Sequence, residues 1–182
     1  MKPDAASQQL PARCVAFSDD GKSLLAAGVG GIARVWSLEN EQAPPSIYDV
    51  PDVGAFTSGA FSADGAWIVL GGDDKRARLW KVGAAGSTAN APIVFEGHAD
   101  QIEDVAILQS GAAPMRVMTA SLDKSARIWD PRIGSPDRVG RELLTLRKHT
   151  LGVTAIDATK DGGLIMTAGR DGAVILWPAG RE

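Results

Sequence analysis

Four tryptophans recur along the chain at a nearly constant interval. Trp36, Trp80, Trp129 and Trp177 are 44, 49 and 48 residues apart. Each ends a short run in which apolar and polar residues alternate, a pattern typical of a half-buried β-strand. A fixed period of this length indicates a stack of similar supersecondary units, each of which needs its neighbours to bury its apolar face. The spacing therefore points to a repeat architecture.

Further strands surround each tryptophan strand. An apolar run ending in small residues comes before it, as in SLLAAG (23–28) and LIMTAG (164–169), and another short run comes before that. Three units join these two runs by Asp-Gly, which favours tight hairpins because glycine adopts positive φ without steric cost. The third unit has the longer QSGAAP (109–114) instead.

A fourth strand follows each of the first three tryptophans across a loop, and no stretch of ten or more residues keeps a helical period. We therefore predict an all-β chain, one segment over 1–182, built from four four-stranded units. Their approximate boundaries are 7–50, 55–96, 98–147 and 149–178.

A set of polar residues accompanies the last two tryptophans. In a simple antiparallel hairpin with its tip at Lys124, Thr119 and Trp129 face each other, so the threonine hydroxyl can accept the indole proton. The histidine before the first strand can receive the hydroxyl proton, and the turn aspartate can hold the other ring nitrogen. We predict this hydrogen-bonded chain in both units, since a partly satisfied buried network is worse than an apolar core. Its members are His98, Thr119, Asp123, Trp129, His149, Thr167, Asp171 and Trp177.

This arrangement resembles the repeat of the WD-repeat β-propellers, which runs from a Gly-His pair to a Trp-Asp pair with Ser or Thr and Asp between them. The third unit matches fully, from Gly97-His98 to Trp129-Asp130. The second unit keeps only Asp74 and Trp80, and the first keeps only its tryptophan. The departures are Lys148 and Pro178 in the fourth unit, Asp52 and Leu70 in the second, and Ala26 and Gly30 in the first.

The resemblance implies a closed ring of seven or eight blades, and four units make an open half-ring. The fourth unit stops after its tryptophan strand, and the 2–5 segment that would supply its outer strand carries two charges and a proline. If each of the two end faces leaves about 500 Å² of apolar surface exposed, the chain loses roughly 25 kcal/mol of hydrophobic stabilisation. This loss is larger than the stability of an ordinary domain. Two resolutions stay open: a second copy completes an eight-bladed ring, or the chain is part of a longer propeller.

Composition narrows the expected partners. Nineteen basic and 22 acidic residues give a net charge of -3, which offers no electrostatic reason to expect nucleic acid or an anionic membrane surface. No window approaches the roughly 20 apolar residues of a membrane helix, and the first dozen residues lack the apolar core of a secretory signal. The single Cys14 allows no internal disulfide, in agreement with a reducing compartment. We expect a cytoplasmic protein with protein partners.

Residues that could suggest catalysis have structural explanations. His98 and His149 are the only histidines; they lack the Cys pair or HExxH pattern of a zinc site, and the predicted network uses both. A triad of Ser121, His98 and Asp123 would draw on the same network, and no GxSxG elbow accompanies it. We predict no catalytic residue, no metal and no cofactor.

Cys14 and three other segments are also expected to have structural roles. Cys14 lies in an apolar strand and is expected to be a core residue. GVGG (28–31) joins two strands without a following helix and is therefore a hairpin turn. GGDDK (71–75) has two carboxylates but lacks the other oxygen ligands of a calcium site. The basic run 132–149 is interpreted as a solvated loop and edge strand, in preference to a phosphopeptide site.

The resemblance implies a non-catalytic interaction scaffold that presents loops to a protein or peptide. In this family, contacts often lie on the face formed by the loops before the first strand and between the second and third strands. Two alternatives stay open: a sensor or regulatory half of a larger multidomain protein, and a hydrolase or lyase, which lacks an unassigned cluster of titratable residues. On this face the candidate partner-binding residues are Asp73, Lys75, Asp100, Gln101, Leu122, Lys124, Leu151 and Arg170.

Overall fold

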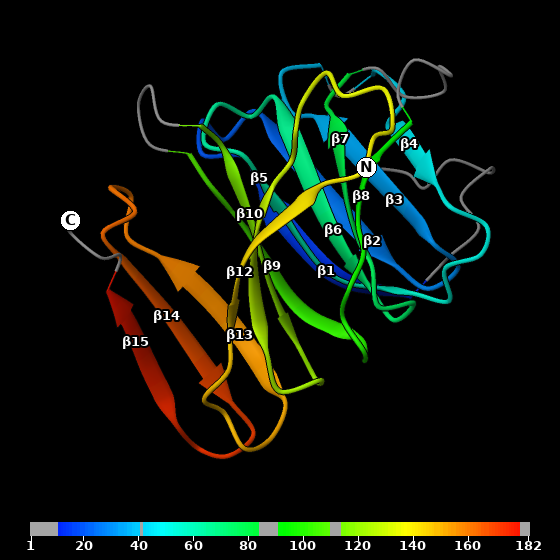
Figure 1. Cartoon of the computed structure of the whole chain (residues 1–182). Coiled ribbons are helices and arrows are strands. Elements are labelled where there is room, and N and C mark those ends of the chain that lie inside the picture. The colour runs from blue at the N-terminus through cyan, green and yellow to red at the C-terminus, as the bar shows by residue number, and fades with distance from the viewer. Residues whose placement is uncertain (1–10, 41, 84–90, 110–113, 179–182) are drawn as a thin grey trace.

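The computed structural model describes residues 11–40, 42–83, 91–109 and 114–178. Every element of regular secondary structure among these residues is a β-strand. The strands form four separate antiparallel sheets (Figure 1). The predicted all-β architecture of four blades is confirmed. We number the sheets blade 1 to blade 4 in chain order.

Within each blade the strands follow the order of the chain. Blade 1 consists of β1 (Ala12–Phe17), β2 (Ser23–Gly28), β3 (Ile32–Ser37) and β4 (Ser46–Asp49). Blade 2 consists of β5 (Phe56–Phe61), β6 (Trp67–Gly72), β7 (Ala77–Lys81) and β8 (Ile93–Phe95). Blade 3 consists of β9 (Ile102–Leu108), β10 (Arg116–Ser121), β11 (Ala126–Asp130) and β12 (Arg141–Leu146). Blade 4 consists of β13 (Val153–Ala158), β14 (Leu164–Gly169) and β15 (Val174–Pro178).

Blade 4 has three strands in the described part of the chain, so the general prediction of four strands per unit does not hold there. The 2–5 segment considered for this edge lies outside the described residues. β15 is therefore an edge strand of its sheet.

The hairpins have the backbone that their sequences predict. The Asp-Gly turns place Gly21, Gly65 and Gly162 at φ of 70°, 67° and 69°, the left-handed region that glycine adopts without steric cost. In the GVGG turn, Gly31 has φ of 67°, and a Cβ there would lie 2.2 Å from the carbonyl oxygen of Val50. Only glycine fits this position, so the interpretation of GVGG as a hairpin turn is confirmed.

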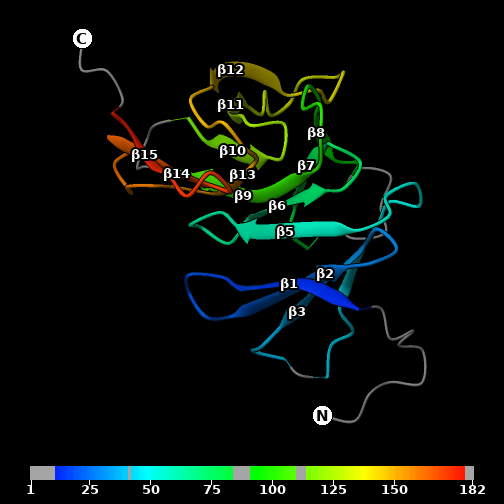
Figure 2. The same ribbon diagram turned by 90° about the horizontal axis from the view of Figure 1, so that it is seen from below.

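The blades stack through their first strands. β1, β5, β9 and β13 lie side by side in that order, and Figure 2 shows the four sheets following one another from β1 to β15. Three apolar cores fill the spaces between successive blades. The first contains Trp80 from blade 2, the second contains Trp129 from blade 3, and Trp177 from blade 4 packs against the third. The described residues thus form an open arc of propeller blades, in which no described blade covers the outer face of blade 1 or of blade 4.

Candidate functional site

Blade 3 contains the complete hydrogen-bonded chain. Trp129 Nε1–H donates to Thr119 Oγ1 at 2.9 Å, and the same oxygen lies 2.7 Å from His98 Nε2. The other ring nitrogen, Nδ1, lies 2.8 Å from Asp123 Oδ2. Thr119 and Trp129 are fully buried, and His98 is 7% exposed. The network ties the second and third strands of the blade to the loop that precedes its first strand.

The donors in this chain have one consistent order. An indole nitrogen can only donate, so Trp129 gives its hydrogen to Thr119. The threonine hydroxyl then donates to His98 Nε2, and His98 Nδ1–H donates to Asp123. Each hydrogen is used once, and no buried polar atom of the four side chains lacks a partner. Because every polar atom of the network has a hydrogen-bond partner, the network stabilises the blade. Loss of one member would leave unpaired polar groups in a low-dielectric interior.

The strand register differs from the simple prediction. Thr119 pairs with Arg127, and Trp129 pairs with Val117, so the expected direct pairing of Thr119 with Trp129 is wrong. The hairpin is centred on Asp123, one residue earlier than expected, and the equivalent hairpin of blade 1 has the same centre at Gly30. The Asp123 carboxylate accepts the backbone N–H of Ser125 at 2.9 Å within this turn. Thr119 and Trp129 are diagonal neighbours on one face, which a large indole still spans.

Blade 4 repeats the arrangement at nearly the same distances. Trp177 Nε1–H donates to Thr167 Oγ1 at 2.9 Å, and this oxygen lies 2.9 Å from His149 Nε2. His149 Nδ1 lies 3.0 Å from both carboxylate oxygens of Asp171. The replacement of the preceding glycine by Lys148 leaves this geometry intact. Trp177 is only half-buried, and its strand β15 is the edge of a three-stranded sheet in the described part of the chain.

Blade 2 replaces the network with an ion pair that the sequence reasoning missed. Leu70 fills the threonine position, and Arg78 binds Asp74 through two hydrogen bonds of 3.1 and 2.5 Å. The side chains are 7% and 15% exposed. The sequence feature that could have indicated this pair is an arginine two residues before the tryptophan. Blade 3 has the same feature in Arg127, whose guanidinium lies 5.9 Å from the centroid of the Trp129 ring.

A second group that the sequence did not reveal links the blades at their inner strands. Asp104 on β9 accepts a hydrogen bond from Ser58 Oγ of blade 2 at 2.8 Å and one from Ile156 N of blade 4 at 3.0 Å. Burial raises the pKa of its carboxyl above the ordinary value, against the opposing effect of these hydrogen bonds. One carboxylate therefore connects three blades, a contact that depends on how the blades stack.

The two network aspartates have strongly lowered pKa values. Burial alone would raise the pKa of Asp123, but hydrogen bonds from His98, Ser125 and the Ala99 backbone outweigh it and hold this pKa far below 3.8. The hydrogen bond from His149 is the largest cause at Asp171, whose pKa is also far below 3.8. Both carboxylates are thus stabilised in their ionised form by the fold.

We expect acid to destabilise the chain through these two groups. A carboxyl whose pKa is lower in the folded state contributes stability that is present above its unfolded pKa and is lost as the pH falls toward the folded value. The urea concentration at the midpoint of unfolding should therefore decrease once the pH is below about 4, the ordinary pKa of aspartate. Tryptophan fluorescence across a urea series at several pH values measures it. In Asp123→Asn the decline should be shallower; an unchanged slope would show that this aspartate is not responsible.

The side chains weighed for catalysis have other contacts. Ser121 Oγ donates to the backbone carbonyls of Asp100 and Gln101 at 2.9 Å, so a triad of Ser121 with His98 does not form. The described residues contain no group of three or more His, Cys, Asp or Glu side chains that could hold a metal ion. Cys14 is half-buried, and burial raises the pKa of its thiol. The described residues contain no helix that is long and apolar enough to span a membrane.

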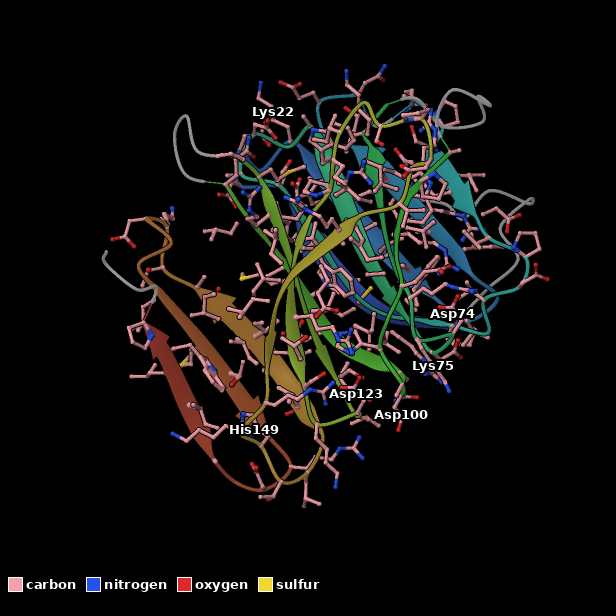
Figure 3. All side chains as sticks on the ribbon, in the orientation of Figure 1. Lys22, Asp74, Lys75, Asp100, Asp123 and His149 are labelled. Atoms are coloured by element: carbon pink, nitrogen blue, oxygen red, sulfur yellow. The ribbon has the colours of Figure 1, made fainter. Side chains whose placement is uncertain are left out.

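The predicted partner face lies at one end of the arc. Figure 3 shows Lys75 and Asp100 at the same end as the network residues Asp123 and His149, with Lys22 at the opposite end. All eight predicted residues come from turns and loops that connect strands at this end, within 72–76, 96–101, 121–125, 147–152 and 169–173. We call these residues the loop face. Five of them are exposed and three are half-buried; the exposed ones are Lys75, Asp100, Lys124, Leu151 and Arg170.

The loop face is held by repeated backbone bonds. The N–H groups of Asp73, Leu122 and Arg170, at equivalent hairpin positions, donate to carbonyls of the loops that enter their own blades at 3.0, 3.1 and 2.8 Å. Two residues later, Lys75 and Lys124 both have φ of 71°. This backbone region is strained for a residue with a side chain. The backbone therefore fixes the direction in which both lysine side chains leave the hairpin.

Sequence comparison identifies the repeats independently. The family model "WD domain, G-beta repeat" matches the chain four times, at residues 7–37, 51–81, 91–130 and 140–178. Each match ends at, or within one residue of, the end of a tryptophan-containing strand. Each match covers the first three strands of one blade, and the third and fourth matches begin with the outer strand of the preceding blade, β8 and β12.

Three relatives show how far the similarity extends. Protein transport protein sec13 of Emericella nidulans is 28% identical over 110 residues, which is 60% of this chain and 35% of sec13. Actin-interacting protein 1-2 of Arabidopsis thaliana is 26% identical over 172 residues, 92% of this chain and 26% of that protein. Cilia- and flagella-associated protein 52 of Chlamydomonas reinhardtii is 26% identical over 168 residues, with 92% and 25% coverage.

The aligned part of the chain spans between a quarter and about a third of the length of these relatives. The four family matches cover the four tryptophan strands and both complete Trp–Thr–His–Asp networks. The chain belongs to the WD-repeat family.

Proposed function

We propose that the chain is a non-catalytic interaction module whose loop face binds a protein or peptide. The observation that carries the proposal is the convergence of side chains from three blades on one end of the arc, on backbones fixed by hydrogen bonds. Membership of the WD-repeat family supports a role in protein interaction in general. Such a surface works through a few well-packed anchors with charged groups around them.

The chemistry of the loop face favours a partner with both charged and apolar groups. Lys75, Lys124 and Arg170 are basic, Asp100 is acidic, and Leu151 is a large apolar side chain that is 49% exposed. Arg170 lies 3.7 Å from Glu103, so one of the cations is already partly compensated. The two lysines at the hairpin tips are therefore the strongest candidates for contact with acidic groups of a partner.

A cytoplasmic location is part of the proposal. The thiol of Cys14 is free, which agrees with a compartment that keeps thiols reduced. We also propose that the histidines act only in structure, since both ring nitrogens of His98 and of His149 are within hydrogen-bond distance of network side chains. This use supports a scaffold over a hydrolase or lyase.

A second candidate is that the arc is the regulatory or sensor portion of a larger protein. The length of the relatives favours it, because the aligned part of the chain covers only 26% of the Arabidopsis protein and 25% of the Chlamydomonas protein. The reading frame on both sides of the coding sequence tests it. A catalytic domain encoded in the same frame would support this candidate, and stop codons at both ends would exclude it.

Charge reversal on the loop face tests the main proposal. We expect Lys75→Glu/Lys124→Glu to lower the capture of a specific partner from a lysate of the source cells by about tenfold or more, a loss of about 1.4 kcal/mol in binding. Quantitative mass spectrometry of the bound fraction measures it. Lys22→Glu is the control, since Lys22 lies at the opposite end (Figure 3). Captured proteins that respond equally to both changes would contradict binding at the loop face.

A further inference from the structure

Each junction between blades joins two different kinds of face. In blades 2, 3 and 4 the tryptophan lies on the face turned toward the preceding blade: Trp80 packs with blade 1, Trp129 with blade 2 and Trp177 with blade 3. We call this the tryptophan face, and the other side of each blade the reverse face. Every junction in the arc therefore packs a reverse face against a tryptophan face.

The uncovered face of blade 1 is a tryptophan face. Phe17 pairs with Leu24, and Leu24 pairs with Trp36, so the three side chains form one row across the sheet. The equivalent row in blade 2 is Phe61, Ile68 and Trp80, and it lies in the first core. In blade 1 this side of the sheet is open to solvent, with Val15 69% and Phe17 66% exposed.

The uncovered face of blade 4 is a reverse face. Met166 pairs with Leu176 in the way that Met118 pairs with Ile128 in blade 3. Met118 and Ile128 are buried in the third core, against blade 4. Their counterparts have no covering blade, so Met166 is 42% exposed and Leu176 is 57% exposed. Val174, on the same face, is 63% exposed.

One chain therefore carries both halves of a junction of the type it already forms three times. We propose that two copies close into an eight-bladed ring around a two-fold axis, with the reverse face of blade 4 in each copy packed on the tryptophan face of blade 1 in the other. At about 500 Å² per face, the two junctions bury roughly 2,000 Å², within the range of specific interfaces. A two-fold axis satisfies all four end faces at once.

The charges on the two end faces agree with this pairing. Arg34, next to Trp36 on the tryptophan face of blade 1, occupies the position at which Arg78 binds Asp74 in blade 2. Its own blade has Gly30 where that aspartate would be. The reverse face of blade 4 carries an exposed carboxylate, Asp157, which pairs with Met166 across the sheet. Arg34 and Asp157 thus have opposite charges, and the tryptophan face of blade 1 also carries one exposed carboxylate, Asp49, in the row of Ile32.

Light scattering on the 1–182 chain at micromolar concentration tests the ring directly. The expected mass is twice the 19.0 kDa of the chain and stays constant as the concentration rises. A monomer would overturn the proposal and leave other chains, or further blades of a longer chain, as the cover for these faces. A mass that keeps rising beyond the dimer would also overturn it, because a face-to-face contact that does not close forms open filaments.

Single substitutions then test the two-face arrangement. Phe17→Glu and Leu176→Lys should each halve the mass, since each places a charge in both junctions of its dimer. The two side chains are exposed within one chain, so circular dichroism should show both variants folded. Leu151→Glu, on the loop face, is the matched control and should remain dimeric. A Leu176→Lys variant that stays dimeric would overturn the pairing of blade 4 with blade 1.

Mixing the two variants gives the sharpest result. A dimer of one Phe17→Glu chain and one Leu176→Lys chain contains one unmodified junction and one junction in which the new charges are opposite. We expect the mixture to recover the dimer mass that neither variant shows alone, and a mixture that stays monomeric would contradict the ring. The test does not involve the loop-face lysines, so its failure is separate from failure of the proposed partner binding.

Discussion

Thr119→Val is expected to lower the free energy of unfolding by about 2 to 6 kcal/mol, because two buried groups lose their partner at once and each unpaired group costs about 1 to 3 kcal/mol. Valine has nearly the shape of threonine but neither donates nor accepts. Trp129 Nε1–H would have no acceptor, and His98 Nε2 would have no donor. Urea unfolding at one fixed chain concentration, followed by tryptophan fluorescence, measures the loss.

Two further variants separate the hydrogen bonds from packing. Thr119→Ser keeps the hydroxyl and removes one methyl group, which is expected to cost about 1 kcal/mol. Thr167→Val makes the same change in blade 4, where Trp177 is half-exposed, so water can replace part of the lost bonding and the loss should be smaller. If Thr119→Val changed the stability by less than about 0.5 kcal/mol, the network would not be a stabilising element.

The second large effect is expected at the ion pair of blade 2. Asp74→Ala should destabilise the chain by about 3 to 5 kcal/mol, because it leaves the Arg78 guanidinium buried without its partner. The Arg78 side chain is only 7% exposed, and its guanidinium donates two hydrogen bonds to Asp74. The same urea titration gives the difference from the unmodified chain.

The charge explanation is tested by removing the arginine as well. Blade 4 already has an apolar residue, Ile175, at the equivalent position of its strand. Arg78→Leu/Asp74→Ala should therefore recover most of the stability lost in Asp74→Ala, since replacing both members of a buried pair is often close to neutral. A double variant no more stable than Asp74→Ala would mean that the loss reflects the turn contact of Asp74 with the Arg76 backbone at 3.4 Å.

The polar networks of blades 3 and 4 could be predicted because their logic is local. A buried indole N–H needs an acceptor, and the threonine, histidine and aspartate lie within one repeat of it. The prediction of the register failed, since the turn is centred one residue earlier than expected, even in blade 1, where Gly30 stands at the position of Asp123. Such a shift depends on turn geometry that the residue types alone do not fix.

Two features of the candidate site depended on contacts between units. The ion pair of Arg78 was missed because an arginine stands two residues before the tryptophan in blades 1 and 3 as well, so its presence alone did not show that it takes the place of the histidine. Asp104 was missed because its partners, Ser58 and Ile156, come from two other blades. Neither partner lies close to it in sequence.

The amino-acid sequence by itself determined the β-strands, the hairpins and the four-unit repeat, since alternation of side chains and Asp-Gly turns act over a few neighbouring residues. The tertiary structure alone decided which side of each sheet is covered. Packing between units more than 40 residues apart buries Trp129 and leaves Val15, Phe17 and Leu176 in solvent. That asymmetry arises because an interior blade has a neighbour on both sides, whereas each end blade of an open arc has only one.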